Sequence, residues 1–457
     1  MNVARTGFVF ASLAACLFGL SRAYAQAIPL PVVLPDRLSL NECVQILRTR
    51  GLDVLLAEAQ VSSAEGDVGV AGAIPNPAVS LGYGRVLPPS LAPGPGYEVA
   101  RCPDQGPGVG GCSNEQYTFG LSDQAALLDS VSGKRALRLD VAHAALAAAR
   151  MVRADALRVL EFQVKTAYVQ AAQAQRGIAF AKQNQGANTR TLELFLTRLR
   201  SGAINEGDVA RIETQKLEAD QAADQATQTF RMARFALAFL LGSRGPVPEF
   251  TVDDHVLDFT VPAALSAADF EHMLRSAFEH RPDLLALGYQ RVSAESAIAL
   301  AKRQRFPDIT LSAQYTQIGV SQNSIQPPTV SFGVSLPVPI FYQQQGEIRR
   351  AEATYATQSL QQAKTTAQVV NDVSSAMAAF QTSRTLVERM ETALRPAAER
   401  AFQITHLQYD KGASTLMDFL DAQRTYITIN IEYLQDLTNY WTAVYQLEEA
   451  IGTELQR

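Results

Sequence analysis

The chain contains two copies of one pattern, and this repetition limits which folds it can adopt. Matching residues recur at a spacing of 230, then 213, then 210 residues: Asp53 with Asp283, Pro77 with Pro307, Gly120 with Gly333, Gly133 with Gly346, Gly202 with Gly412, Asp208 with Asp418 and Gly242 with Gly452. Glycine and proline mark turns and helix ends. Their ordered recurrence therefore indicates two units of the same fold, rather than two alanine-rich helices that are alike by chance.

Each copy has the same expected order of elements. A helical pattern leads to a proline-marked break, two strands follow, and a helical run of about 70 residues ends at a glycine before a returning helix. The expected strands are about 77–87, 115–124, 307–318 and 328–338, and the long helical runs are 131–200 and 344–410. We therefore expect a first repeat (26–241, tip near 202), a connector (242–266) and a second repeat (267–457, tip near 412).

The predicted strands alternate between apolar residues and small polar ones. In the first strand, Val79, Leu81 and Tyr83 alternate with Ser80, Gly82 and Gly84. One apolar face and one small, polar face is the pattern of a membrane β-barrel, with lipid outside and water inside. A soluble sandwich with one solvated face is the alternative, but its outer face would be expected to carry Lys and Glu rather than hydroxyls and glycine.

Four strands are too few to span a membrane alone. Every backbone group inside the hydrocarbon must be paired, so the barrel must close, and single-chain barrels begin at about eight strands. The chain is therefore expected to share its barrel with copies of itself, eight strands in a dimer or twelve in a trimer. A helix of about 70 residues would extend for about 105 Å at 1.5 Å per residue, which predicts a small barrel on a long helical tube.

Composition and the N-terminus restrict the compartment and the function class. The 40 Lys and Arg against 45 Asp and Glu give a net charge of −5, which argues against a nucleic-acid partner. Residues 1–25 have the charged start, apolar middle and Ala-Tyr-Ala site of a secretory signal peptide. A second site, Leu13-Ala14-Ala15-Cys16, would instead make Cys16 a lipid-bearing N-terminus. Either form leaves the cytoplasm.

The remaining cysteines and the histidines suggest no catalytic or metal centre. Cys102 and Cys112 lie in a loop rich in glycine and proline, where an oxidising compartment favours a disulfide between them. Cys43 lies in an apolar pattern typical of a small core residue. The five histidines are scattered, and no nucleophile or phosphate-loop motif is present. We therefore expect neither an enzyme nor a protein with a cofactor or a bound metal.

The doubled layout resembles the TolC family of outer-membrane efflux ducts over nearly the whole mature chain. The resemblance rests on three segments: VSFGVSLPVPIF (330–341), RSGAINEGDVARIETQ (200–215) and YDKGASTLMDFLDAQRT (409–425). It implies a homotrimer in outer-membrane lipid, with a twelve-stranded barrel and a helical barrel reaching into the periplasm. It also implies partners: a periplasmic adaptor and an inner-membrane transporter of the RND type.

Within the family, PVPIFYQQQGEIRRAEATY (337–355) resembles the CzcC-like branch that serves heavy-metal cation pumps. Ducts for organic drugs and exit ducts for secreted proteins share the fold and remain alternatives. A structural coiled-coil protein of the envelope is a more remote alternative, because it would have no need of the alternating strands.

By resemblance, the two helical tips narrow the periplasmic entrance. The expected gate residues are Asp208, Arg211, Tyr409, Asp418 and Asp421, with Arg211 pairing with an acid of a neighbouring tip. The expected adaptor contacts are Ser201, Gly202, Ala203, Lys411, Gly412, Ala413 and Ser414. Three copies would form rings of carboxylates that attract cations or take up protons at raised pKa values. The alternative is that these acids only favour the positive end of the helix dipole.

Overall fold

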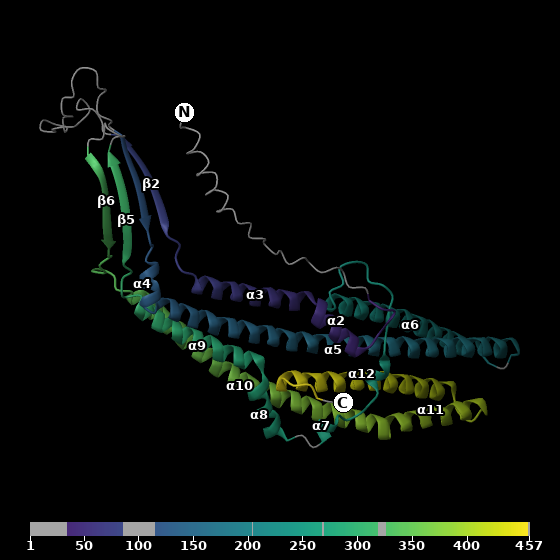
Figure 1. Ribbon diagram of the computed structural model, residues 1–457. Coiled ribbons are helices and arrows are strands. Elements are labelled where there is room, and N and C mark those ends of the chain that lie inside the picture. The colour runs from purple at the N-terminus through teal and green to yellow at the C-terminus, as the bar shows by residue number, and fades with distance from the viewer. Residues whose placement is uncertain (1–33, 86–114, 203, 267–268, 319–325, 456–457) are drawn as a thin grey trace, which may run out of the picture.

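The computed structural model describes residues 34–85, 115–202, 204–266, 269–318 and 326–455. Figure 1 shows an elongated molecule with a sheet at one end and the tips of two helical hairpins at the other. The helix α5 (Lys134–Arg200) has 67 residues and extends for about 100 Å.

The elements follow the doubled order. The first half contains β1 (Arg37–Leu38), α2 (Leu40–Arg50), α3 (Leu52–Gly72), β2 (Ala78–Arg85), β3 (Glu115–Ser122), α4 (Ala126–Val131), α5 and α6 (Glu206–Leu240). The connecting region contains β4 (Thr251–Val252), η2 (Asp254–Leu257) and α7 (Ala263–Ser266). The second half contains α8 (Phe270–His280), α9 (Pro282–Arg303), β5 (Thr310–Ile318), β6 (Gln326–Ser335), α10 (Gln345–Arg389), the π-helical segment η4 (Met390–Leu394), α11 (Arg395–Asp410) and α12 (Leu416–Ile451).

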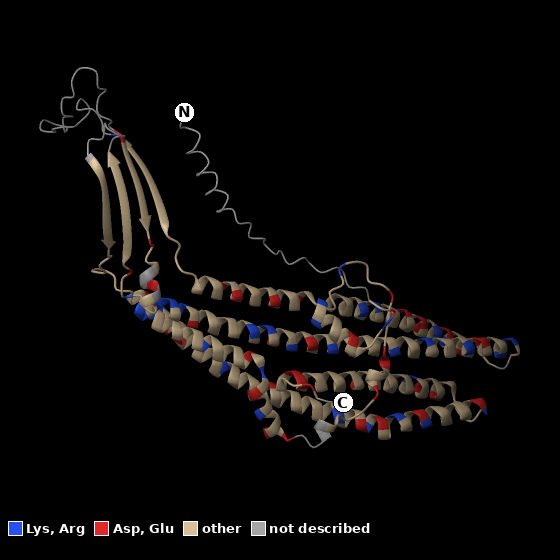
Figure 2. Ribbon diagram, viewed as in Figure 1, with Lys and Arg blue, Asp and Glu red and all other residues tan. Residues whose placement is uncertain are grey.

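The four longer strands form one antiparallel sheet in the order β2-β3-β5-β6. Their register places apolar side chains in continuous rows, one of which is Leu81, Phe119, Tyr315 and Val330. On the other face, Gly82 lies beside Thr118, and a Cβ atom added to Gly82 would come within 2.3 Å of the Thr118 hydroxyl. Small residues therefore lie opposite hydroxyls on the polar face. Figure 2 shows charged residues only near the ends of these strands.

The apolar face of the sheet is exposed in the single chain. Phe332 is 84% exposed and Leu81 is 66% exposed. Among the described strands, β2 and β6 each have a neighbour on one side only. The sheet therefore presents an uncovered apolar surface and two open hydrogen-bonding edges, which are features that proteins normally cover or pair.

The main core lies midway along the helices, where the connector between the repeats folds onto them. The two-residue strands β1 and β4 pair in parallel, and the buried Tyr168 hydroxyl donates to the Leu38 carbonyl oxygen at 2.8 Å. Trp441 and Tyr440 of α12 are also buried in this cluster. The connector also contacts the second repeat, because the Tyr440 hydroxyl of α12 donates to the Thr260 carbonyl oxygen at 2.8 Å. It therefore joins the first repeat to the second. No described helix is both long and apolar enough to cross a membrane.

One sequence pairing between the repeats is wrong. Gly133 was matched with Gly346, but the residue that precedes α10 in the left-handed conformation is Gln344, with φ +62°, as Gly133 with φ +77° precedes α5. Glutamine adopts this conformation only at a cost that glycine avoids. Matching the two repeats by glycine alone therefore displaces this pairing by two residues.

Candidate functional site

The two hairpin tips lie together at the end of the molecule remote from the sheet (Figure 1). In the first tip, Ser201 and Gly202 follow α5, and Asn205 caps α6. In the second, Lys411, Gly412, Ala413 and Ser414 lie between α11 and Thr415, which caps α12. Gly202 and Gly412 adopt positive φ angles of +72° and +75°, which explains why the turn in each repeat needs glycine. Ala203 lies outside the described residues.

An apolar cluster joins the two tips. Phe195 and Ile212 of the first hairpin pack with Leu416, Phe419 and Leu420 of the second, all of them buried. Because aromatic and aliphatic side chains of both hairpins share this cluster, the tips are expected to move as a unit unless the cluster opens.

Tyr409 belongs to this cluster and was expected at the gate. Its ring stacks on Phe419 at 5.5 Å and on Phe195 at 6.1 Å between centroids, and burial raises the pKa of its hydroxyl. Sequence reasoning missed Arg198, whose guanidinium lies 6.0 Å from the Tyr409 ring and whose Nη2 is 4.0 Å from Asp410 Oδ1. Arg198 therefore links the first hairpin to the second.

Asp418 has a local role that the sequence alone left open. Its Oδ2 accepts hydrogen bonds from the Thr415 hydroxyl at 2.7 Å and the Thr415 backbone N–H at 3.1 Å, and its own N–H donates to Thr415 Oγ1 at 3.2 Å. These bonds form a capping box that satisfies donors at the start of the helix. They lower the pKa of Asp418. This shift in the single chain is opposite to the raised pKa expected for a ring of repelling carboxylates.

Asp421 is exposed one turn further along α12. In the part of the chain that the structure describes, its carboxylate makes no hydrogen bond or ion pair. Asp418 and Asp421 are three residues apart on the same helix, so they lie on neighbouring turns. The structure thus places one carboxylate in a cap and leaves the other directed to solvent.

Asp208 and Arg211 contact each other within the first tip. Arg211 Nη1 lies 3.7 Å from Asp208 Oδ1 on the same helix. The pairing expected for Arg211 was with an acid of a neighbouring tip, and in the single chain its partner is instead Asp208. The reason is the helical spacing of three residues, which brings the two side chains together without any second helix.

A buried polar contact above the tips was also missed. Gln423 Nε2 of α12 donates to Asn188 Oδ1 of α5 at 3.4 Å, and the two residues are 8% and 3% exposed. Since buried amides are costly to leave unpaired, this contact fixes which residues of the two hairpins face each other. An isolated Asn or Gln in a helical pattern gives no signal for such pairing.

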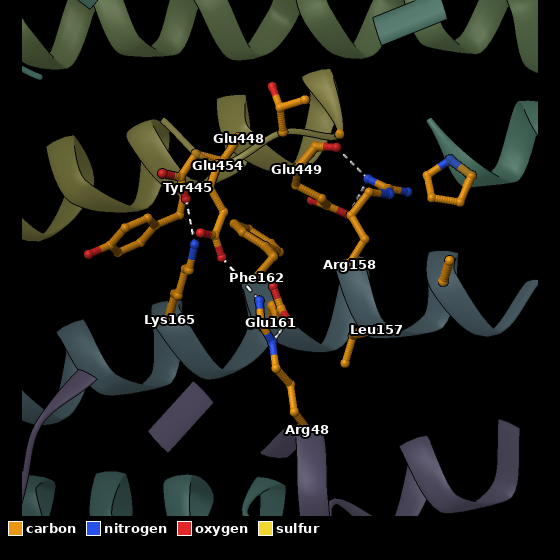
Figure 3. A pocket seen from close by; sticks show the side chains of 14 residues that line it. Arg48, Leu157, Arg158, Glu161, Phe162, Lys165, Tyr445, Glu448, Glu449 and Glu454 are labelled. Carbon is orange, nitrogen blue, oxygen red and sulfur yellow. Dashed lines mark hydrogen bonds and ion pairs between the residues drawn. The ribbon is translucent and has the colours of Figure 1, made fainter. Parts of the chain in front are cut away.

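A second cluster of charged residues surrounds a cavity of about 260 Å³ between α5 and α12. Figure 3 shows Arg48, Arg158 and Lys165 pointing toward glutamates of the opposite elements. Arg48 pairs with Glu161 at 2.6 Å, Lys165 with Glu448 at 2.7 Å and Arg158 with Glu449 at 3.4 Å. Burial raises the pKa of Glu448. Because each of these cations has a carboxylate partner, the cluster joins the end of α12 to α5 and α2.

The cysteine predictions have different outcomes. Cys43 is fully buried in the main core, as expected, and burial raises its pKa to about 12. Cys102, Cys112 and Cys16 lie outside the described residues, so the disulfide and the lipid attachment stay predictions. Among the residues with described positions, no three His, Cys, Asp or Glu side chains form a cluster that could hold a metal ion.

Comparison with known proteins gives the family. The model for "Outer membrane efflux protein" matches residues 43–243 and 273–453, which is more than half of the chain and includes both tips. The chain belongs to this family of outer-membrane efflux proteins. The match confirms the resemblance inferred from the doubled layout. The chain is therefore an outer-membrane transport protein that extends into the periplasm, and it is not an enzyme.

Individual relatives are distant. The chain is 23% identical over 330 residues to the cobalt-zinc-cadmium resistance protein CzcC of Cupriavidus metallidurans, covering 70% of this chain and 74% of CzcC. It is also 23% identical to the toluene efflux pump outer membrane protein TtgF of Pseudomonas putida, covering 71% of this chain and 67% of TtgF.

The fold of this efflux protein matches solved structures. The crystal structure of CusC superposes with a TM-score of 0.71 at 16% identity, covering 91% of this chain and 92% of CusC. At this identity the likeness establishes the TolC-like fold alone. Proteins of the family form trimers and work with periplasmic adaptors and RND-type transporters.

Proposed function

We propose that this protein is the outer-membrane exit duct of a tripartite efflux system, and that three chains close one twelve-stranded barrel. The observation that carries the proposal is the sheet. Its apolar rows continue across all four strands, and its edge strands β2 and β6 each lack a second neighbour among the described strands. Pairing β6 of one copy with β2 of the next satisfies both edges and turns the apolar rows toward lipid.

We infer that the cargo is heavy-metal cations. The name of the relative CzcC refers to cobalt, zinc and cadmium resistance, and the tips of this chain carry exposed carboxylates. Three copies of Asp208, Asp418 and Asp421 around one axis would concentrate cations at the periplasmic entrance, since a cleft lined by one sign of charge attracts counter-ions. The cation is cargo in this proposal and needs no resident binding site.

The gate and the partner contacts complete the proposal. Tyr409 and the apolar cluster hold the two hairpins of each chain together, and Arg211 is available to exchange Asp208 for an acid of the next copy when the trimer forms. The exposed turn residues Ser201, Gly202, Lys411 and Gly412, with Ala203, Ala413 and Ser414, form the surface that we assign to the periplasmic adaptor. The inner-membrane partner is an RND-type transporter.

Organic solutes are the second candidate cargo, because the relative TtgF, at the same identity as CzcC, is named for toluene efflux. Export of a secreted protein by the same fold remains a third candidate. The test is a strain lacking this gene, grown with cadmium, zinc or cobalt salts and separately with toluene. Metal-cation cargo predicts loss of metal tolerance with a rise in cell cadmium, restored by the wild-type gene. Loss of toluene tolerance alone would assign the duct to organic solutes.

A further inference from the structure

Positive charge gathers where the helices meet the sheet. Figure 2 shows Lys and Arg side chains where α5, α9 and α10 adjoin the strands, and α9 packs against both of the other helices. We call the segments 123–138, 302–309 and 336–350 the junction. They contain eight cationic residues and four acidic ones, a net charge of +4: Lys134, Arg135, Arg138, Lys302, Arg303, Arg305, Arg349 and Arg350, against Asp123, Asp129, Asp308 and Glu347. Since the whole chain has a net charge of −5, the junction is a basic region of an acidic protein.

The four acidic residues of the junction already have partners. Asp308 pairs with Lys134 at 2.7 Å, Asp129 with Arg138 at 2.6 Å and Glu347 with Arg350 at 2.5 Å, and Asp123 accepts from the Leu311 backbone N–H at 2.8 Å. Lys134 and Asp129 are buried, so their ion pairs join the elements of the junction to one another. These acids are therefore already occupied and do not neutralise the remaining cations.

Three cations of the junction have no such partner. Lys302, Arg305 and Arg349 are exposed, and none of their side chains makes a hydrogen bond or an ion pair with another described residue. In a symmetric assembly, the junction of a second copy lies at the same level of the molecule and carries the same excess of positive charge. Assembly therefore leaves these cations available to an anionic partner of a different kind.

Exposed apolar residues lie between these cations and the sheet. Leu336 and Val338 continue the apolar row of β6 beyond the end of the strand, and both are exposed. Phe341 follows them and is 96% exposed. Phe306, just before β5, is also exposed, and its ring centroid lies 5.4 Å from the Arg303 guanidinium. An apolar row, then aromatic rings, then cations is the order found from the hydrocarbon to the head groups of a membrane.

We propose that the junction is a binding surface for anionic phospholipids of the membrane leaflet that faces the periplasm. Lys302, Arg305 and Arg349 contact the phosphate groups, and Phe306 and Phe341 enter the boundary between head groups and acyl chains. Each Lys or Arg near an anionic membrane surface raises the affinity by about fivefold. The inference rests on the proposed function in one respect, because that function places the sheet in the membrane and the helices in the periplasm.

Lipid binding tests the surface. The detergent-solubilised protein is titrated with phosphatidylglycerol, which is anionic, or with phosphatidylcholine, which has no net charge, and bound lipids are counted by native mass spectrometry. We expect the wild type to bind phosphatidylglycerol about tenfold or more tightly than phosphatidylcholine. The Lys302→Gln, Arg305→Gln, Arg349→Gln variant should lose most of this preference, because the three unpaired cations are gone. An equal preference in the wild type and this variant would overturn the proposal.

A matched variant controls for the loss of charge. Lys182→Gln, Arg190→Gln and Arg400→Gln together also remove three exposed cations, but from parts of α5 and α11 that are remote from the sheet (Figure 1). This variant should retain the wild-type preference for phosphatidylglycerol. A loss of preference equal to that of the junction variant would assign the effect to net charge and contradict the surface.

Inorganic phosphate separates a lipid surface from a site for free anions. At matched ionic strength, phosphate should displace phosphatidylglycerol from the wild type no better than chloride does, because the aromatic side chains contribute to binding only when acyl chains are present. Selective displacement by phosphate would refute the lipid surface.

Fluorescence in vesicles gives an independent readout. The single tryptophan of the chain, Trp441, is buried in the main core, so a tryptophan added at the junction can be distinguished from it. Phe341→Trp should be quenched several-fold more by phosphatidylglycerol brominated near the head group than Phe239→Trp, which replaces an exposed residue of α6. Equal quenching at the two positions would contradict the proposal even if the junction variant fails to assemble.

Failure of this inference and failure of the proposed function give different results. A trimer that shows no preference for phosphatidylglycerol would remove the lipid surface and leave the duct in place. A monomer in detergent would remove the shared barrel, whereas the comparison of the wild type with the junction variant would still decide the lipid surface. None of these measurements involves cargo, so an incorrect cargo assignment leaves their results unchanged.

Discussion

Asp208 and Asp418 occupy the same position in the two repeats, the third residue of the helix that follows the tip. The Asp208 N–H donates to the side chain of the capping residue Asn205 at 2.9 Å, and the Asp418 N–H donates to that of Thr415 at 3.2 Å. The repeat spacing of 210 residues is therefore reproduced in the hydrogen bonds. The carboxylates differ in their partners, since Asp208 contacts Arg211 and Asp418 completes a capping box with Thr415.

Thr415→Ala is expected to loosen the second tip. Loss of an N-cap typically costs about 1 kcal/mol of helix stability, so amides at the start of α12 should exchange several-fold faster. Thr415→Ser is the control, because serine keeps the hydroxyl. If the alanine variant protects these amides as well as the wild type, the capping box does not stabilise the tip.

The same cap should depend on pH. Hydrogen bonds lower the pKa of Asp418 from its ordinary value of 3.8. Its contribution to stability is therefore present above the unfolded-state pKa and is lost as the pH falls through the lower folded-state pKa. We expect exchange protection factors at the tip to be constant from about pH 5 to pH 8 and to fall below about pH 3.8. Asp418→Asn should remove this fall, and a fall that persists in the variant would assign it to another group.

Tyr409→Ala should separate the two hairpins of one chain. The ring contacts Phe195 of α5 and Phe419 of α12, and removing it leaves a cavity in the apolar cluster. Removal of a large aromatic side chain from a core costs about 3–5 kcal/mol of stability. Because Tyr409 is only half-buried, the cost of its removal should be at or below the lower of these values. Tyr409→Phe keeps both ring contacts and is the control. Single-channel recording should find a higher mean conductance for the alanine variant, and a conductance equal to that of the control would argue against a closing role.

Cys102 and Cys112 are predicted to form a disulfide in the loop between the first two strands. Closing a short loop in this way restricts the unfolded chain by about 2–3 kcal/mol in the chain-entropy model. Peptide mass mapping without reductant should recover the two cysteines in one linked fragment. Two free thiols, or a bond to Cys43, would refute the pairing, and Cys102→Ser with Cys112→Ser should leave transport unchanged.

Elements of the fold could be predicted from the sequence where the pattern that specifies them is local. The strict alternation of residues such as Val79 and Ser80 predicted the strands. The tips were predicted because each turn requires a positive φ angle, which favours glycine and places Gly202 and Gly412 there. The interruption at Met390–Leu394 was missed, although Pro396 was its visible signal. Proline inside a long helical pattern was not given enough weight against the otherwise regular periodicity.

The site was predicted less completely than the fold because its contacts join distant parts of the chain. Asp418 was identified as a site residue, but the capping box that its carboxylate completes with Thr415 was not predicted. Arg198, Asn188 and Gln423 were missed, since Arg198 becomes informative only beside Tyr409 and Asp410 of α11, and Asn188 and Gln423 only when α5 and α12 lie side by side. Arg211 was expected to pair with an acid of a neighbouring tip, and its contact with Asp208 on the same helix was not predicted.

The shared barrel is tested by the mass of the protein in detergent. Two strands with one open edge each cannot remain unpaired in hydrocarbon, so we expect a trimer that survives purification. Substituting proline for Val79 in β2 or for Val334 in β6 should weaken assembly, because each removes a backbone donor from an edge strand. The same substitution at Val131, an exposed position outside the sheet, is the control. A stable folded monomer would refute the twelve-stranded barrel.

Block of single channels by multivalent cations tests the acidic entrance most directly. Wild-type protein and the Asp418→Asn, Asp421→Asn double variant are compared in planar bilayers, with the cation added on the periplasmic side. Rings of carboxylates raise the local cation concentration by about tenfold or more, so the variant should need a concentration about tenfold higher for half block. The control is Glu213→Gln, at an exposed position on α6. This variant should reach half block at the same cation concentration as the wild type. Equal block of the wild type and the double variant would contradict the acidic entrance and leave Asp418 as a helix cap.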